Sequence, residues 1–147
     1  MKKLLVILAA LSLFACSKVE PELPVPEKAD YKGTVTVIYQ DSPFENEDIE
    51  VNFTPSEDGK TADIVIYKIR FVPQMPVTID VTIPGVSLTA TSEGIDIECD
   101  SVIPLAMGGE YPRYTVTDLK GIQKKDGTLE FSLNFGDYPT SFKGSKQ

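Results

Sequence analysis

Apolar and polar residues alternate along most of the chain after residue 30. In residues 77–83, valine and isoleucine alternate with threonine and aspartate, and in residues 129–135 leucine and phenylalanine alternate with polar residues. A period of two is typical of β-strands that bury one face, and these runs are dominated by the β-branched and aromatic residues that strands favour. No segment after residue 30 has a helical period of useful length. The pattern therefore predicts an all-β domain.

Turn residues separate the alternating runs. Residues 56–60 and 124–127 each contain an Asp-Gly pair typical of hairpins, and Pro84-Gly85 is expected to break the middle of the chain. About eight strands are expected, near residues 33–40, 48–55, 61–71, 76–83, 86–91, 94–100, 112–120 and 127–135. A short run at 141–143 is placed to pair back to the first strand. The spacing fits a sandwich or a barrel, and a single antiparallel up-and-down barrel of about eight strands leaves no free strand edge.

The phase of the alternation assigns side chains to the barrel interior. An eight-stranded barrel has room for side chains or for one small ligand. The expected inward set is bulky, which favours an interior filled by the protein's own side chains. It comprises Phe53, Tyr67, Ile69, Phe71, Ile79, Ile95, Ile97, Phe131 and Leu133.

The chain begins with a short leader. Met1-Lys2-Lys3 is positively charged, and residues 4–14 are apolar except for Ser12. This run is shorter than the roughly 20 apolar residues of a membrane-spanning helix, so a secretory signal is predicted. The leader ends in Leu13-Phe14-Ala15-Cys16, which resembles the lipobox of bacterial lipoproteins.

The lipobox resemblance implies a lipid anchor at Cys16. In that family the cysteine is diacylated on sulfur, becomes the mature N-terminus and is then acylated on nitrogen with a fatty acid such as palmitate. Two or more acyl chains hold a protein stably on a membrane, so the resemblance implies a cell-envelope protein anchored at the outer membrane. The alternative is an ordinary cleaved signal followed by a chance cysteine. The expected organisation is a signal peptide at 1–15, the lipidated cysteine with a proline-rich linker at 16–30, and a barrel domain at 31–147.

The linker is rich in proline. Pro21, Pro24 and Pro26 prevent helix and favour an extended polyproline conformation. At about 3.1 Å per residue, residues 17–30 would form a semi-rigid spacer of roughly 40 Å that holds the domain clear of the membrane. A proline-rich recognition peptide is the alternative.

Charge and composition narrow the function classes. The chain carries 14 basic and 22 acidic residues, a net charge of −8 that becomes −10 once Lys2 and Lys3 leave with the leader. An acidic surface disfavours nucleic acid and anionic head groups, and its ordinary role is solubility. Histidine is absent, which removes most zinc and copper sites and the usual general base near neutral pH. We therefore expect no enzyme, no cofactor and no metal site, and a monomeric chain.

Three further features invite a chemical interpretation. Cys99 shares the inward phase of its strand, so inert packing is expected rather than redox chemistry. Residues 41–48 gather acidic and amide oxygens that calcium prefers, but their spacing is not that of an EF-hand, and a solvated acidic loop is expected instead. Carboxylate pairs can hydrolyse glycosides, yet the alternation turns the acidic side chains of residues 96, 98 and 100 outward.

A second resemblance rests on motifs spread along the domain. These motifs are Tyr-Lys-Gly-Thr-Val-Thr-Val at 31–37, Phe-Val-Pro-Gln-Met-Pro at 71–76, Val-Thr-Ile-Asp-Val-Thr-Ile-Pro-Gly-Val at 77–86, Asp-Gly-Thr-Leu-Glu-Phe-Ser-Leu at 126–133 and Phe-Lys-Gly at 142–144. In this order they resemble the calycin-like β-barrel domain of small secreted lipoproteins from gut Gram-negative bacteria. The resemblance implies a lipocalin-related barrel and no assigned activity or catalytic residue. Asp100-Ser101-Val102 resembles the three-residue O-glycosylation acceptor of the same bacterial group, which makes Ser101 a candidate modification site.

Two functions remain open from the sequence. The first is a lipid-anchored outer-membrane barrel that binds a small apolar ligand or a glycan, with the Gly-rich loop at 107–110 placed to gate one end. The second is a structural or accessory lipoprotein whose filled barrel contacts a partner protein through its loops. A continuous interior cavity of roughly 300 Å³ or more would favour the first. A solid interior with exposed apolar side chains would favour the second.

Overall fold

The computed structural model describes residues 22–147, and all of its regular elements are strands apart from one short 3-10 turn. The strands are β2 (Ala29–Tyr39), β3 (Ser42–Pro55), β4 (Thr61–Ile69), β5 (Ile79–Thr91), β6 (Gly94–Val102), β7 (Leu105–Ala106), β8 (Gly109–Glu110), β9 (Val116–Lys124), β10 (Thr128–Phe135) and β11 (Tyr138–Lys146). The 3-10 turn η2 (Pro112–Tyr114) precedes β9.

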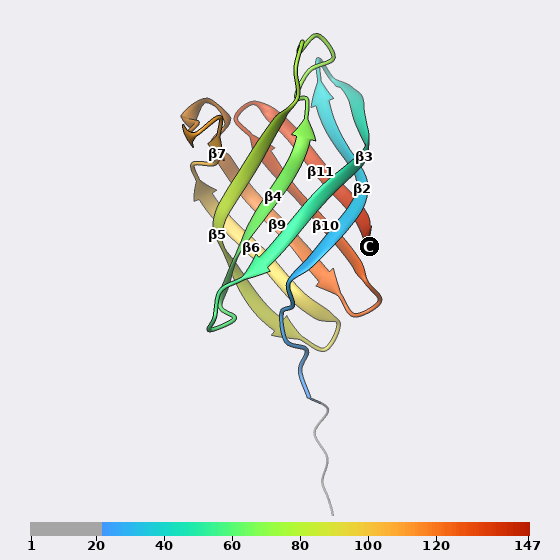
Figure 1. Cartoon of the computed structure of the whole chain (residues 1–147), viewed down its shortest axis with the longest axis vertical. Coiled ribbons are helices and arrows are strands. Elements are labelled where there is room, and N and C mark those ends of the chain that lie inside the picture. Colours follow the sequence, from blue (N-terminus) through green and yellow to red (C-terminus); the bar gives the residue numbers. More distant parts are fainter. Residues whose placement is uncertain (1–21) are drawn as a thin grey trace, which may run out of the picture.

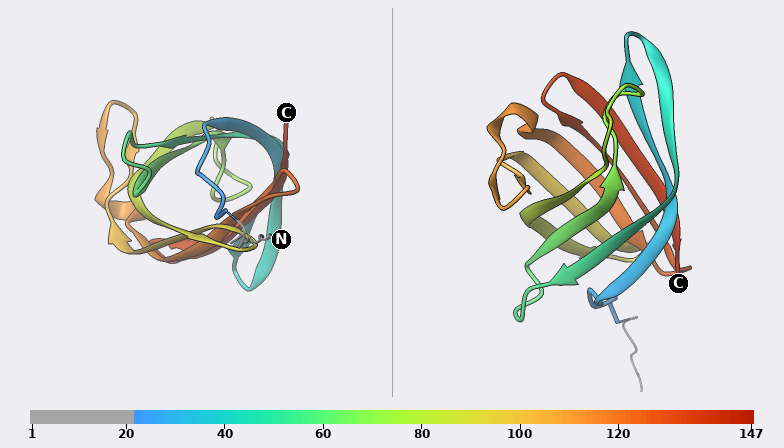
Figure 2. Two further views of the ribbon diagram at one scale, coloured as in Figure 1. Left: turned by 90° about the horizontal axis from the view of Figure 1, so that it is seen from below. Right: turned by 45° about the horizontal axis from the view of Figure 1, so that its top comes forward.

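Eight of these strands form a closed antiparallel barrel (Figure 1). Around the ring, β2 to β6 follow one another in chain order, then β9, β10 and β11, and β11 pairs back to β2. The view along the barrel in Figure 2 shows the closed ring. The all-β, up-and-down barrel predicted from the alternation is confirmed. The pairing of the 141–143 run with the first strand is confirmed as well, since Phe142 lies opposite Val35.

Alternation explains why these segments are strands. In β10, Leu129 and Phe135 are fully buried and Phe131 and Leu133 nearly so, while the residues between them face outward. The apolar face of each strand turns into the barrel and the polar face meets water, as the period of two requires.

The count of eight strands arises differently from the prediction. Residues 76–83 and 86–91 were expected as two strands, but β5 runs without a break from Ile79 to Thr91. Pro84-Gly85 forms a β-bulge there: Gly85 adopts φ +66°, and the register against β4 shifts between Ala62 and Ile64. A bulge tolerates proline and adds one residue to the strand without ending it. The eighth strand of the ring is β11.

A second bulge, in β4, changes which side chains of that strand point into the barrel. Lys68 adopts φ +57°, and the register between β4 and β5 shifts between Ile66 and Ile69. The extra residue switches the phase within β4. Ile64 and Ile66 are therefore buried before the bulge, and the predicted inward position of Tyr67 is wrong, since that side chain is 37% exposed. After the bulge Ile69 and Phe71 point inward as predicted.

Strand ends also differ from expectation. β3 begins at Ser42, so most of the expected acidic loop is strand. β9 begins at Val116, after η2, and Val77 lies outside β5 with 59% exposure. The Gly-rich segment at 107–110 forms the turn and second strand of the small β7–β8 hairpin.

The barrel has two distinct ends (Figure 1). We call the end where the N-terminal segment enters the proximal end; it carries the turns at 56–60, 92–93 and 125–127. The distal end carries the turn at 40–41, the loops at 70–78 and 103–115, and the turn at 136–137.

Candidate functional sites at the two ends of the barrel

The barrel interior is filled by side chains. Residues from opposite sides of the ring, such as Val51, Ile64, Ile83 and Leu119, have 0% exposure. A cavity able to hold even one water would leave part of its lining accessible. The interior is therefore a packed core and offers no pocket to a ligand among the described residues.

Aromatic rings close the distal end. Phe71, from the loop after β4, stacks on Tyr114 of η2 with centroids 4.2 Å apart and meets the edge of Phe135 at 5.0 Å. Tyr138 of β11 lies against both Phe71 and Tyr114, with centroids 6.2 and 6.1 Å away. Burial is the main cause that raises the pKa of the Tyr114 hydroxyl. Offset and edge-on pairs contribute beyond their buried area, so the cluster holds together four segments at the distal end: the loop after β4, η2, β10 and β11.

The side-chain amide of Asn46 fastens the distal loop to the wall. Its Nδ2 donates to the carbonyl oxygen of Arg70 at 3.1 Å, and its Oδ1 accepts from the Arg70 amide at 2.9 Å. The Arg70 Nε then donates to the Met75 carbonyl at 3.1 Å. Asn46 is 9% exposed, so these bonds satisfy a buried amide as well as the backbone that follows the bulge.

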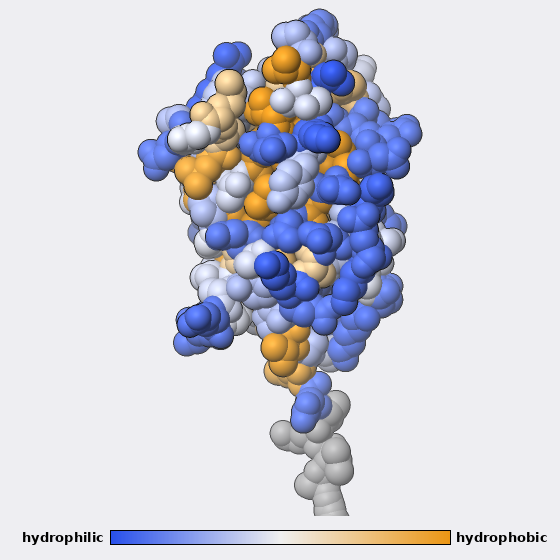
Figure 3. Space-filling view, viewed as in Figure 1, coloured by the Kyte–Doolittle hydropathy of each residue, from blue (hydrophilic) through white to orange (hydrophobic). Residues whose placement is uncertain are grey.

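Exposed apolar side chains gather beyond this closure. Val77, Ile103, Leu105 and Met107, which we call the distal patch, are 59%, 37%, 40% and 77% exposed. β7 pairs with β5 through Leu105 and Thr82, which brings the loop at 103–115 beside the loop at 70–78 that leads into β5. Figure 3 shows apolar surface towards this end above a largely hydrophilic wall. A hollow of about 520 Å³ lies between β5 and the β7–β8 hairpin, with Leu105, Met107 and Asp80 in its lining.

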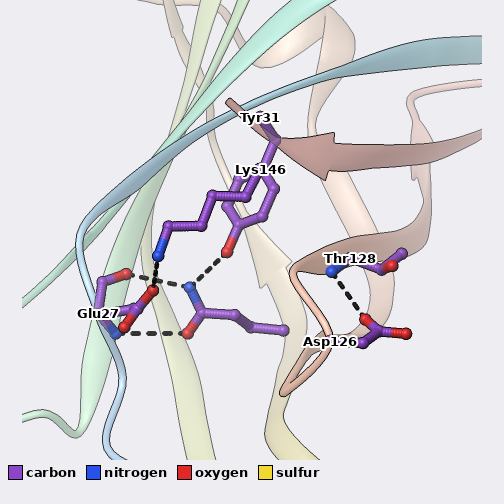
Figure 4. Close-up of polar contacts among 6 residues, drawn as sticks. Glu27, Tyr31, Asp126, Thr128 and Lys146 are labelled. Carbon is purple, nitrogen blue, oxygen red and sulfur yellow. Dashed lines mark hydrogen bonds and ion pairs between the residues drawn. The ribbon is translucent and has the colours of Figure 1, made fainter.

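The proximal end is closed by the N-terminal segment, which passes beneath the barrel (Figure 2). Gln123 of β9, 5% exposed, holds this segment. Its Nε2 donates to the Glu27 carbonyl at 3.0 Å and to the Tyr31 hydroxyl at 2.8 Å, and its Oε1 accepts from the Glu27 amide at 3.4 Å. The Lys146 ammonium donates to the Glu27 carboxylate (Figure 4). The last residues of the expected spacer are therefore fastened to the barrel.

A cavity of about 510 Å³ opens beside this fastening. The N-terminal segment forms one side through Val25 and Glu27, and the β9–β10 turn at 125–127 forms another. Lys124, Lys125 and Lys146 also line it. Lys124 is additionally paired with Glu130 of β10 at 3.3 Å, at the barrel surface.

The predicted site residues fall in different places. Cys16, the predicted lipidation site, lies outside the described residues. Ser101 is exposed on β6, opposite Thr117 of β9. Cys99 is half-buried against the core, and burial is the main cause that raises the pKa of its thiol. A raised pKa keeps the thiol protonated and unreactive near neutral pH.

The acidic candidates face solvent. Residues 96, 98 and 100 lie on the outer face of β6, where Glu98 and Lys120 form an exposed ion pair at 3.9 Å. No group of three or more carboxylate, cysteine or histidine side chains within residues 22–147 is arranged to hold a metal ion. No helix in that same range is long and apolar enough to cross a membrane.

No protein-family model, curated protein or solved structure matches this chain. The eight-stranded antiparallel barrel is consistent with a calycin-like fold.

Sequence reasoning missed Gln123, Asn46 and Tyr31, which organise the two ends. A signal for Gln123 exists, since it continues the inward phase of Leu119 and Gly121 with an amide side chain. Asn46 sits in a run of acidic residues that conceals the strand, and its inward phase is separated from Ile49 by a bulge at Asp48, where φ is +56°.

Proposed function

We propose that this chain is a lipid-anchored outer-membrane lipoprotein whose filled barrel is a rigid support for docking a partner protein at its distal end. The observation that carries the proposal is the filled interior. A small apolar ligand or a glycan held within the barrel would need an enclosed cavity of about 300 Å³ or more, and the core side chains occupy that space. The accessory role is favoured over the ligand-binding one, and no catalysis is assigned.

The distal patch supports a protein partner. Single exposed apolar residues are ordinary on soluble proteins, whereas a group of them on neighbouring loops is typical of an interaction surface. Asp80 lines the same hollow as Leu105 and Met107, and Glu110 lies opposite Leu105 in the β7–β8 hairpin. The expected partner therefore offers an apolar surface with basic residues around it, because charges at the rim steer association and select partners.

The anchor is proposed from the leader and from Cys16. A Cys16→Ser chain should move from the membrane to the soluble fraction and lose incorporation of a labelled palmitate analogue. A conservative Ser17→Ala change beside it is the control and should leave both unchanged. Equal membrane retention of the Cys16→Ser chain would contradict the anchor.

The docking surface is tested by site-specific photo-crosslinking in cells. A photoreactive residue in place of Leu105 or Met107 should give one discrete adduct with another protein, and the same residue at Ser132 on the barrel wall should give none. The adduct should disappear when Val77 is changed to Asp in the same chain. Absence of an adduct, or one of twice the chain's own mass, would overturn the partner assignment.

A native mass spectrum of the protein purified from its host tests the ligand-binding alternative. A filled barrel should release no apolar molecule or glycan from its interior. Retention of such a molecule, with core amides shifted on its removal, would restore that alternative.

A further inference from the structure

The proximal cavity has about 510 Å³ of space, which is in the range of small-molecule sites. It differs from the distal hollow of similar volume in its lining, which carries three lysines and two carboxylates. Its walls come from the N-terminal segment, from β9 and its turn, and from β11. The cavity therefore exists only because the N-terminal segment is fastened across the proximal end.

Three ammonium groups border the cavity in a chain that is acidic as a whole. Lys124 and Lys146 pair with Glu130 and Glu27, and all four side chains in these pairs are at least a third exposed. Exposed ion pairs contribute little stability and exchange readily, so both ammonium groups can turn to an anion. Lys125 makes no ion pair with any residue of the described range and is exposed on the turn.

A buried hydroxyl donor also lines the cavity. Tyr31 is 1% exposed, and its oxygen accepts the hydrogen bond from Gln123. Its own proton finds no acceptor within residues 22–147. Burial is the main cause that raises the pKa of this hydroxyl, so it remains a donor throughout the physiological range. A buried donor without an acceptor costs free energy that a bound acceptor would recover.

Two carboxylates, those of Glu27 and Asp126, line the proximal cavity together with the lysines. The ligand should therefore carry both a negative and a positive charge. The Asp126 Oδ1 accepts from the Thr128 amide at 2.9 Å (Figure 4), which leaves its second oxygen unused by that bond. Glu27 likewise meets Lys146 through Oε1 alone. A polyanion would be repelled by these two groups, whereas a ligand with one phosphate and one ammonium matches both signs of charge.

Position points to the source of such a ligand. Under the proposed function, on which this inference rests, the acyl chains sit on Cys16. The seven residue steps from Cys16 to Leu23 reach at most about 25 Å even when fully extended. Leu23 and Val25, 58% and 78% exposed, border the same end. We propose that the proximal cavity binds the aminoalkyl phosphate head group of a zwitterionic membrane phospholipid.

In this arrangement the lysines and the Tyr31 hydroxyl hold the phosphate, and Asp126 and Glu27 hold the ammonium. The site orients the barrel, because a bound head group fixes the proximal end against the membrane and directs the distal patch away from it.

The test is a titration of the acylated mature chain in detergent micelles, followed by amide NMR shifts. O-phosphoethanolamine is the probe, with inorganic phosphate and ethanolamine added separately. The expected result is a saturable shift of the turn at 125–127 with phosphoethanolamine, and at least about fivefold weaker binding of either fragment alone, the factor that one lost hydrogen bond or ion pair represents.

Variants locate the site. Lys125→Ala and Tyr31→Phe should each weaken phosphoethanolamine binding about fivefold, while Lys120→Ala, which removes an exposed lysine on the barrel wall, should leave it unchanged. Lys125 lies on an exposed turn, so the Lys125→Ala chain still tests binding in the proximal cavity if the Tyr31→Phe chain fails to fold.

Three results would overturn the assignment. They are the absence of a saturable shift, an equal effect of Lys125→Ala and Lys120→Ala, and inorganic phosphate binding as tightly as phosphoethanolamine. The last would make free phosphate the ligand. The probe is soluble and the same titration is carried out on the Cys16→Ser chain, which carries no lipid at that position, so failure of the anchor in the fractionation and failure of the head-group site are separate outcomes.

Discussion

At the distal end the amide of Asn46 pairs with both the N–H and the carbonyl of Arg70, and at the proximal end the amide of Gln123 does the same with Glu27. Each side chain bonds to the backbone of a residue that lies outside the strands and has no partner strand there. What surrounds them differs: packed aromatic rings lie beneath the distal end, and a charged cavity lies at the proximal end.

The same pair of amide hydrogen bonds therefore serves two purposes in this barrel. The distal amide is buried and bonds to the backbone of Arg70, next to the ring at the centre of the aromatic cluster, so its loss should destabilise the whole fold. The proximal amide holds a segment that water already reaches, since Glu27 is exposed. Its loss should free that segment and leave the barrel closed.

Removing the ring at the centre of the distal cluster should have the largest effect. Phe71→Ala deletes a fully buried side chain that contacts three other rings, and such truncations cost about 3–5 kcal/mol. The free energy of unfolding in urea measures this loss. Tyr67→Ala, at an exposed aromatic four residues earlier, is the control, and an equal loss there would contradict a special role for the cluster.

The two amides provide the sharpest comparison. Asn46→Ala should lower the free energy of unfolding by about 1–3 kcal/mol, because it leaves buried polar groups of the Arg70 backbone without partners. Gln123→Ala should lower it less and instead raise hydrogen exchange in residues 24–30, since release of this segment is a local opening. If hydrogen exchange increased in the same residues of the Asn46→Ala and Gln123→Ala variants, the two ends of the barrel would be equivalent.

Acid should act mainly at the proximal end. Hydrogen bonds from Ser56 and Thr128 are the main causes that lower the pKa values of Asp58 and Asp126, which lie in two proximal turns. A carboxyl whose folded pKa is lowered contributes stability above its unfolded pKa and loses it as the pH falls through the folded value. Stability should therefore fall below about pH 4, and more gently in Asp58→Asn and Asp126→Asn chains. Urea midpoints from pH 5 to pH 2 measure the slopes, with Asp137→Asn at a distal turn as the control.

The distal patch should show the smallest effect on folding. Leu105→Ser and Met107→Ser replace exposed side chains, and such changes usually alter stability by less than about 0.5 kcal/mol. Binding of a hydrophobic dye should fall while the melting temperature stays constant. A large loss of stability would mean that these residues belong to the core.

How much the sequence predicts depends on whether the alternation is unbroken. In β10 the period of two runs from Leu129 to Phe135, and its inward set was predicted without error. In β4 and β5 the period is interrupted at Lys68 and Gly85, which adopt positive φ. A bulge shifts the phase by one residue, and nothing in the local composition distinguishes it from a turn.

The ends of the barrel were not predictable in the same way. Phe71, Tyr114, Phe135 and Tyr138 come from four segments, and only the closed ring brings them together. Gln123 and Glu27 are 96 residues apart. Contacts of this separation follow from the register of the strands, which the alternation alone leaves open.

The pairing of β11 with β2 sets the order in which this chain can fold. At the other junctions the paired strands are separated by a turn or a short loop or, between β6 and β9, by the β7–β8 hairpin and η2, whereas this junction joins the first strand of the barrel to the last. A loop of this length is slow to close. Until β11 is in place, β2 and β10 each keep an open edge. Chains shortened before Tyr138 should therefore associate through these edges, so β11 protects the folded chain from aggregation.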